Sequence, residues 1–318
     1  MAISRVSTYQ STQALSKQLN ATQAKFNKLT QQISSGVKVS STAENPVAAR
    51  GIIKAKKELE NIEEYKKNIE LADNELSEVD DTLVSVGSQL TRAKDLAMQV
   101  ANGTVGAEEI KAYQSELNSI IDNVKSLANT KYGDQYIFAG TRTETVPYEE
   151  NAAGLMYNGD YGNRYAIIGE ETTEPINMLG IDVFGQASFT IDENGKIVFP
   201  DPDTDSKGIF GALYQLKAAI QDVENIDTSQ LETAMKGIDD GFNTSVTART
   251  KVGAISNGFD DIQSALDNDS LNITELCSNL QDTDLPSAIS DWYSVYQSMQ
   301  ASYSMMSQTM NVSLLNYI

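Results

Sequence analysis

Apolar residues recur at intervals of three and four along most of the chain, as they do on one face of an α-helix. The longest such run covers residues 62–100 and predicts a helix about 57 Å long with one buried seam. Shorter runs cover residues 8–33 and 110–127. The break at Asn102-Gly103 between the long run and the 110–127 run predicts an antiparallel helical hairpin. The predicted seam of the long run consists of Ile62, Tyr65, Ile69, Ala72, Leu76, Val79, Leu83, Val86, Leu90, Ala93, Ala97 and Val100.

Residues that begin or end helices mark the limits of these runs. The first run stops before Gly36, which can adopt the left-handed conformation of a helix C-cap. Helical spacing returns at residues 209–223 and 231–266, and the stretch Asp227-Thr228-Ser229 precedes the second of these runs as a predicted N-cap region. A last predicted helix begins after Pro286 and continues to the end of the sequence. The seam expected for the 231–266 run contains Leu231, Met235, Ile238, Phe242, Arg249, Val252, Phe259, Ile262 and Leu266.

The middle of the chain follows a different pattern. Between about residues 132 and 205, glycine, proline, tyrosine and β-branched residues favour strands and turns. Residues 189–199 fit a β-hairpin in two registers. A two-residue turn pairs Ile191 with Val198, whereas a three-residue loop pairs Ile191 with Ile197. The second register keeps the apolar residues together, including the phenylalanines at the two ends of the hairpin, and is therefore the predicted one.

These elements predict a nested organisation in a mainly α fold with an inserted β domain. Long, coiled-coil-like helices from both ends of the chain are expected to pack together as a terminal helical assembly domain, residues 1–45 plus 286–318. A central helical bundle domain is expected at residues 46–131 plus 206–285. The β-rich outer domain is inserted at residues 132–205.

The two terminal segments differ from ordinary surface helices in their charge. Residues 1–34 carry four cationic and no anionic side chains, and residues 287–318 carry Asp291 as their only charge. Exposed helices usually present mixed lysine and glutamate. The terminal seams instead predict burial, both against each other and among copies of the chain. The expected assembly interface consists of Leu15, Leu19, Phe26, Leu29, Ile33, Ile289, Trp292, Tyr296, Met299, Tyr303, Met306, Met310 and Tyr317.

Composition narrows the range of functions. The 318 residues include no histidine, the commonest general acid or base and a frequent metal ligand. A formal net charge of -20 argues against binding to nucleic acid and to anionic membrane surfaces. The sequence shows neither a cleavable signal peptide pattern nor an uninterrupted apolar run of about 18 residues. We therefore expect no catalytic site, no cofactor, no metal, no nucleic acid and no membrane partner.

Two chemical alternatives can be weighed against this expectation. Asp201, Asp203 and Asp205 alternate as in a calcium loop, but Ser206 and Ala212 stand where an EF-hand needs glycine and glutamate. A secreted glycan hydrolase would need a pair of carboxylates in the β segment, and no spacing singles one out. The acids available for such a pair include Glu149, Glu150, Glu170 and Asp182.

Several segments resemble one known family. Residues 29–39 (LTQQISSGVKV) followed by 44–49 (ENPVAA) are similar to the N-terminal signature of the bacterial flagellin superfamily. Residues 136–148 (YIFAGTRTETVPY) and 282–289 (DTDLPSAI) resemble further segments of its hook-associated branch. The three regions occur in the expected order, and the 136–148 segment distinguishes this branch from flagellin itself.

The resemblance implies a structural role in the bacterial flagellum. In this family the termini line a tubular structure, the following helices form its wall, and the inserted domain faces outward. The resemblance implies a homo-oligomeric ring at the hook-filament junction, between hook-associated protein 1 and flagellin. It also implies export by the flagellar type III export apparatus with an export chaperone, without a cleaved signal peptide, so that the protein is extracellular. The alternative within the family is flagellin, the filament subunit.

Overall fold

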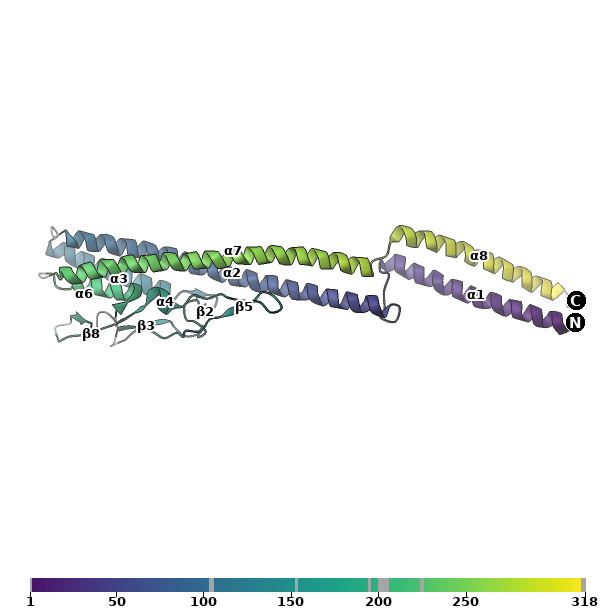
Figure 1. The fold of residues 1–318 in the computed structure, drawn as a ribbon, viewed down its shortest axis with the longest axis horizontal. Coiled ribbons are helices and arrows are strands. Elements are labelled where there is room, and N and C mark those ends of the chain that lie inside the picture. The colour runs from purple at the N-terminus through teal and green to yellow at the C-terminus, as the bar shows by residue number, and fades with distance from the viewer. Residues whose placement is uncertain are drawn as a thin grey trace. The chain divides into compact units, whose positions relative to one another are not determined.

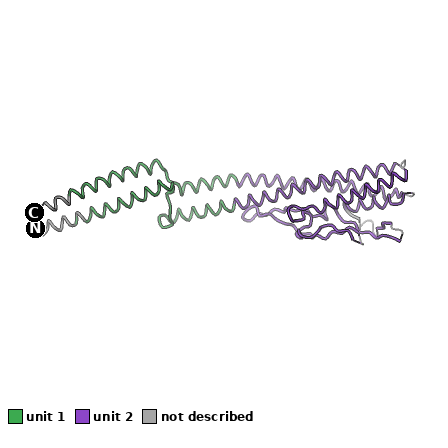
Figure 2. The backbone as a smooth tube through the Cα atoms, turned by 180° about the vertical axis from the view of Figure 1, so that it is seen from behind, with its two compact units in different colours: residues 1–61, 267–318 green, residues 62–266 purple. Residues whose placement is uncertain are grey.

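The computed structural model describes residues 2–102, 106–151, 154–193, 196–199, 206–223 and 226–315. The chain divides into two compact units (Figure 2). Unit 1 comprises residues 1–61 and 267–318, and unit 2 comprises residues 62–266. The sequence predicted three domains, with other boundaries than these two units, and that division stays a prediction.

Helices dominate both units, and the predicted mainly α fold class is confirmed. α1 and α8 lie side by side in unit 1 (Figure 1), as expected for the two terminal helices. The helices are α1 (Ala2–Ser35), α2 (Pro46–Ala101), α3 (Ala107–Ala128), α4 (Gly180–Phe184), α6 (Gly208–Ala219), α7 (Thr228–Gln281) and α8 (Leu285–Leu315). α8 begins one residue before Pro286 rather than after it, because the first turn of a helix tolerates a proline without an N–H group.

The seam predicted for α2 is the centre of unit 2. All twelve of its residues are buried except Tyr65, which is half-buried. α3 adds Leu117, Ile120 and Val124 to the same core. Arg92 of α2 forms an ion pair with Glu116 of α3, with 2.6 Å between Nε and Oε1. These contacts fit the antiparallel hairpin expected for the two helices.

The inward face of α7 differs from the prediction. Small residues occupy much of it, whereas Phe242 is 40% exposed and Arg249 is also exposed. A Cβ atom at Gly241 would lie 2.8 Å from Ile209 Cγ1, so α6 packs too closely for a larger residue there. Placing Phe242 and Arg249 on the seam was therefore wrong. The buried positions of α7 are Leu231, Ala234, Ile238, Gly241, Ser245, Ala248, Val252 and Phe259.

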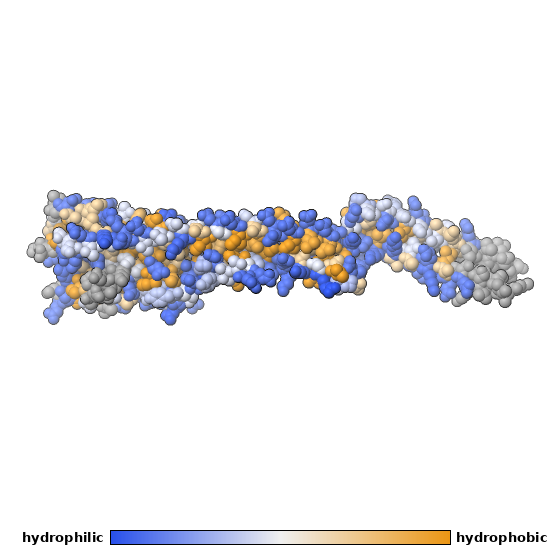
Figure 3. Space-filling view, viewed as in Figure 1, coloured by the Kyte–Doolittle hydropathy of each residue, from blue (hydrophilic) through white to orange (hydrophobic). Residues whose placement is uncertain are grey.

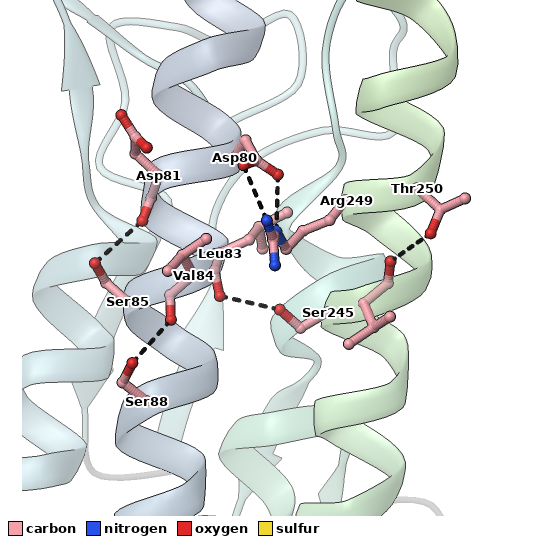
Figure 4. A network of polar contacts seen from close by, with 10 residues as sticks. Asp80, Asp81, Leu83, Val84, Ser85, Ser88, Ser245, Arg249 and Thr250 are labelled. Atoms are coloured by element: carbon pink, nitrogen blue, oxygen red, sulfur yellow. Dashed lines mark hydrogen bonds and ion pairs between the residues drawn. The ribbon is translucent and has the colours of Figure 1, made fainter.

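Polar contacts set the register between α2 and α7 (Figure 4). Arg249 contacts Asp80 with both ends of its guanidinium group, at 2.8 Å from Nε and 3.2 Å from Nη2. The buried Ser245 hydroxyl donates a hydrogen bond of 3.2 Å to the Leu83 carbonyl oxygen. A bidentate ion pair and a satisfied buried hydroxyl both require one alignment of the helices, so they favour this register over a slipped one.

The inserted segment contains short antiparallel strands, which confirms the β-rich region expected in the middle of the chain. Its largest sheet has the strand order β10-β7-β4-β3, and the other strands form three two-stranded pairs. The strands are β1 (Lys131–Tyr132), β2 (Gln135–Tyr136), β3 (Tyr148–Asn151), β4 (Gly154–Tyr157), β5 (Tyr165–Ile167), β6 (Thr173–Pro175), β7 (Gln186–Ser188), β8 (Thr190–Ile191), β9 (Ile197–Val198) and β10 (Ser206–Lys207).

The β8–β9 hairpin has the predicted register. Ile191 pairs with Ile197, and the rings of Phe189 and Phe199 approach to 6.3 Å between their centroids. The glycine of the loop, Gly195, lies outside the described residues. The choice between the two registers was therefore correct at the strands.

Gly140 has a backbone conformation that explains its place in the 136–148 segment. Its φ of 72° is in the left-handed region, and a Cβ atom there would lie 2.2 Å from Asp160 Oδ1. Asp160 accepts hydrogen bonds from the hydroxyl and N–H of Thr141 and from the N–H of Gly162, and these bonds lower the pKa of its carboxyl group. Glycine at position 140 thus permits a loop that the carboxylate closes.

One charged contact anchors the insertion to α2 within unit 2. Arg164, just before β5, forms a bidentate ion pair with Glu75, which is only 7% exposed. Asn177, which is also buried, accepts a 2.8 Å hydrogen bond from the Arg164 backbone N–H and donates one to Gly162. The loop before β5 is therefore fixed at both its backbone and its side chain.

Candidate assembly surface

α1 contributes one continuous seam to its contact with α8. The seam has the predicted spacing, and Leu29 is its most buried member at 8% exposure. The other members are half-buried, because only one helix packs against them. The α1 seam consists of Leu15, Leu19, Thr22, Phe26, Leu29 and Ile33.

α8 meets α1 with smaller residues than expected. The expected seam included Ile289, Tyr296 and Tyr303, which are 41%, 37% and 50% exposed. Small side chains occupy the adjacent positions on the inward face, which allows the two helices to approach. The inward face consists of Ala288, Trp292, Val295, Met299, Ser302 and Met306. Of the remaining expected residues, the side chain of Met310 and the whole of Tyr317 lie outside the described part.

Aromatic contacts join the two terminal helices. The Phe26 ring lies 5.2 Å from the Trp292 ring and 6.1 Å from the Tyr296 ring, measured between centroids. The Trp292 indole N–H donates a 2.9 Å hydrogen bond to the Thr30 hydroxyl. Tyr296 stacks on Trp292 with an interplanar angle of 2°. These directed contacts fix how α1 and α8 pack on each other, although most of the residues between the two helices are only half-buried.

α8 keeps exposed apolar and aromatic side chains beside its contact with α1. The space-filling view shows apolar and polar residues mixed over the α1–α8 pair (Figure 3). Tyr293 is 58% exposed, in addition to Ile289, Tyr296 and Tyr303, and the helical spacing places these four on one side of α8. Met305 is 62% exposed on another side of the helix. Asp291 is the only charged residue between positions 287 and 318. A clustered apolar surface with so little charge is typical of a surface that another protein covers.

The structure gives a role to several residues of the two N-terminal motif segments, 29–39 and 44–49. Gly36 ends α1 with a φ of 71°, as predicted for a left-handed C-cap. Asn45 caps α2 by accepting a 3.1 Å hydrogen bond from the Ala48 N–H, and Pro46 occupies the first helical position. Glu44 accepts hydrogen bonds from the Ser40 N–H and hydroxyl, which with Lys28 lower the pKa of its carboxyl group.

A short backbone pairing lies between the helix pairs of unit 1. Val37 forms an antiparallel bridge with Asp282. The Lys38 N–H donates to the Gln281 carbonyl oxygen at 2.7 Å, and the Thr283 N–H donates to the Gly36 carbonyl oxygen at 2.9 Å. The two chain segments that lead to α1 and α8 are thus joined.

The four carboxylates considered for catalysis each have different surroundings in the structure. Glu150 forms an ion pair with Lys125, Glu149 accepts a hydrogen bond from Asn158, and Glu170 and Asp182 are exposed. Across the described residues, no cluster of three or more metal-binding side chains occurs. The stretch containing Asp201, Asp203 and Asp205 lies outside this part. None of the described helices is long and apolar enough to cross a membrane.

Acidic substitutions in the α1–α8 seam should affect assembly more than the stability of the free chain. Leu19→Asp and Met306→Asp each place a carboxylate among the half-buried apolar side chains between α1 and α8. Both positions lie in unit 1, so the hydrophobic core of unit 2 stays intact. We expect incorporation into a larger assembly to fall by about a hundredfold or more, because the carboxylate must then be buried. Co-sedimentation with the assembly and thermal unfolding of the monomer measure the two effects.

The exposed neighbours provide matched controls for these variants. Asn20→Asp and Gln308→Asp add the same charge at exposed positions just beyond Leu19 and Met306, away from the α1–α8 seam and from the side of α8 that carries Ile289 and Tyr303. We expect both controls to assemble normally. Equal damage by Leu19→Asp or Met306→Asp to assembly and to the stability of the monomer would instead indicate an ordinary intramolecular core.

Comparison with known proteins identifies the two ends of the chain. The profile for the bacterial flagellin N-terminal helical region matches residues 6–143, and that for the C-terminal helical region matches residues 235–318. Flagellar hook-associated protein 3 of Escherichia coli (strain K12) is 24% identical over 98% of both chains. Flagellin of Bacillus subtilis (strain 168) is 21% identical over 92% of this chain and 91% of its own.

A solved structure supports the fold. The chain described as a flagellar hook-associated protein from Vibrio parahaemolyticus superposes with a TM-score of 0.63 at 21% identity, covering 75% of this chain and all of that one. The first profile covers α1 to α3 and the start of the insertion, the second covers most of α7 and all of α8, and the full-length relatives match across both units. This chain therefore belongs to the bacterial flagellin family, within which it is similar to hook-associated protein 3 over nearly its whole length.

Proposed function

We propose that this chain is a structural subunit of the bacterial flagellum that sits at the hook-filament junction and couples hook to filament. The observation that carries the proposal is the exposed row of apolar and aromatic residues on α8, a helix in which Asp291 is the only charged residue. Membership in the flagellin family and the similarity to hook-associated protein 3 support the same role.

Burial of this row gives a driving force for assembly. Complete burial of an exposed side chain such as Ile289 contributes about 1.5–3 kcal/mol. Ile289 is 41% exposed in the free chain, so covering it on assembly would supply part of that free energy. Asp291 is the only charge of the segment, so few charges lose their hydration when α8 is covered. The α1–α8 pair is thus suited to burial among copies of itself.

Assembly assigns a separate role to each of the three predicted domains. The terminal domain, residues 1–45 plus 286–318, carries the contacts between copies that bury α8. The central helical domain, 46–131 plus 206–285, forms the wall, and the insertion at 132–205 forms the outer surface. The partners are further copies of the chain, hook-associated protein 1 and flagellin. Identical subunits that use two different faces for each contact produce rings or tubes of this kind.

The proposal also concerns how the protein reaches its place. Export through the flagellar type III apparatus, with an export chaperone, requires neither a cleaved signal peptide nor a disulfide. The single cysteine, Cys277, is consistent with such a route. The role is mechanical, so no residue of the chain is assigned a catalytic function.

The position of the protein along the flagellum distinguishes a junction protein from flagellin, the alternative that the family profiles also allow. We expect an antibody against the chain to label one point per flagellum, where the hook meets the filament. We also expect the purified chain alone not to grow long filaments on flagellar seeds. Labelling along the whole filament, together with growth of long filaments, would show that the chain is flagellin. Absence from flagella would contradict both roles.

A further inference from the structure

Unit 1 separates its charges between its two chain segments. Residues 1–61 carry nine cationic and three anionic side chains, a formal charge of +6. Residues 267–318 carry six anionic and no cationic side chains, a formal charge of -6. The unit is therefore close to neutral as a whole, but one segment is cationic and the other is anionic.

The start of α2 presents cationic and apolar residues on the same outward face. Ala49, Ile52 and Ala55 are buried, which identifies the inward face of residues 46–61. Positions on the opposite side include Arg50, Ile53, Lys54 and Lys57, all of which are exposed. Ile53 is 62% exposed, so this face combines a large aliphatic side chain with cations on either side of it.

The end of α7 presents the anionic counterpart. Ile273, Cys277 and Leu280 are half-buried on its inward face. Leu271 is 70% exposed on the outward face. Asp267 lies four residues before it and Glu275 four residues after it, so both acids share its side of the helix. Leu271 is therefore an exposed apolar residue between two carboxylates.

These two outward faces point away from each other within one chain. A Cβ atom at Gly51 would lie 3.0 Å from Leu280 Cδ1, so the start of α2 and the end of α7 pack through their inward faces. The cationic face and the anionic face consequently lie on opposite sides of the helix pair, where they cannot cover one another. A second copy placed alongside can cover each of them.

We propose that the outward face of α2 around Ile53 docks on the outward face of α7 around Leu271 in a neighbouring copy of this chain. This inference rests on the proposed function, because it names the lateral contact between copies. Opposite charge selects the pairing of unlike faces, and the two aliphatic residues supply the apolar centre. Such a contact is heterologous, so each copy keeps one face of each kind free for the next copy.

Cross-linking tests the geometry of this contact in assembled flagella. The background is the full chain with Cys277→Ser, expressed in cells in place of the native copy. A chain that also carries Ile53→Cys and Leu271→Cys should give dimers and higher multimers with a short bismaleimide. Each single cysteine variant alone should give none, whereas a mixture of the two single variants should give dimers. Multimers from one single variant, or none from the double variant, would overturn the inference.

Charge exchange tests the electrostatic pairing. Lys54→Glu with Lys57→Glu should lower incorporation by about tenfold, because attraction becomes repulsion at every contact. Adding Asp267→Lys and Glu275→Lys to the same chain should restore incorporation to within about threefold of the original. Lys67→Glu with Lys236→Glu makes the same change in net charge at exposed positions of unit 2 and should have little effect.

The outcomes separate this inference from the function on which it rests. All substituted side chains are exposed, so thermal unfolding of each purified variant should change by less than about 2 °C. If the unsubstituted chain labels the junction but charge exchange does not restore incorporation, the inference alone is overturned. If the unsubstituted chain is absent from flagella, the proposed function fails first and the inference fails with it.

Discussion

Deletion of residues 289–318 should abolish incorporation into flagella while leaving unit 2 folded. The deletion removes Trp292, Met299 and the exposed row of α8, and thereby the surface proposed for contacts between copies. Every buried member of the large hydrophobic core lies between Ile69 and Phe259, so that core loses no packing. Immunoblotting of isolated flagella should find the truncated chain below the detection limit.

The same variant tests whether the two units are structurally independent. α1 loses its partner helix, and isolated helices of low charge and weak apolar seams are marginally stable in water. We therefore expect the far-UV circular dichroism signal to fall by no more than the contribution of the deleted segment and α1. The urea midpoint of unit 2 should be unchanged, and Asn20→Asp serves as the full-length control. A loss of helical signal well beyond these segments would contradict the nested organisation.

The sequence predicted the structure best where aliphatic residues alone define a buried face. The seam of α2 is such a case, because each position from Ile69 to Val100 needs only an aliphatic side chain of ordinary size. The seam of α7 was less predictable. Gly241 and Ser245 are buried there because α6 and α2 approach closely, and that closeness is a property of the partners rather than of α7.

The face of α8 that contacts α1 was equally hard to predict from the sequence. Tyr296 and Tyr303 have the spacing of a seam, but Val295 and Ser302 face α1. A sequence pattern shows that a face is apolar without showing whether the same chain or another copy covers it. The predicted residues therefore divide into an intrachain seam and an exposed row, and that division became visible only when α1 and α8 were placed together.

Contacts between distant charged residues were beyond prediction from sequence. Glu75 lies in a helix rich in acids and lysines, and Arg164 lies in a loop 89 residues later. Neither residue type is usually buried, so pattern analysis assigns both to the surface. The segment that contains Gly140 was recognisable as a sequence motif. The reason for its glycine, a left-handed backbone packed against Asp160, became visible only in the structure.

Loss of one partner from the Arg164–Glu75 ion pair should destabilise unit 2 by about 2–4 kcal/mol. The Arg164 and Glu75 side chains are only 18% and 10% exposed, so Arg164→Met leaves a carboxylate that water barely reaches. Glu75→Gln should have a similar cost, because the guanidinium group then lacks its counter-charge. Equilibrium urea unfolding followed by circular dichroism measures both changes, provided that the transition of unit 2 is two-state.

The exposed ion pair between Arg92 and Glu116 provides the control, since its side chains are 48% and 37% exposed. Arg92→Met should cost less than about 1 kcal/mol. The double variant Arg164→Met with Glu75→Leu should recover most of the stability lost in Arg164→Met, because it leaves no unpaired buried charge. If Arg164→Met costs no more than Arg92→Met, the insertion is held to α2 by its apolar contacts alone, and the ion pair merely selects the position of the loop before β5.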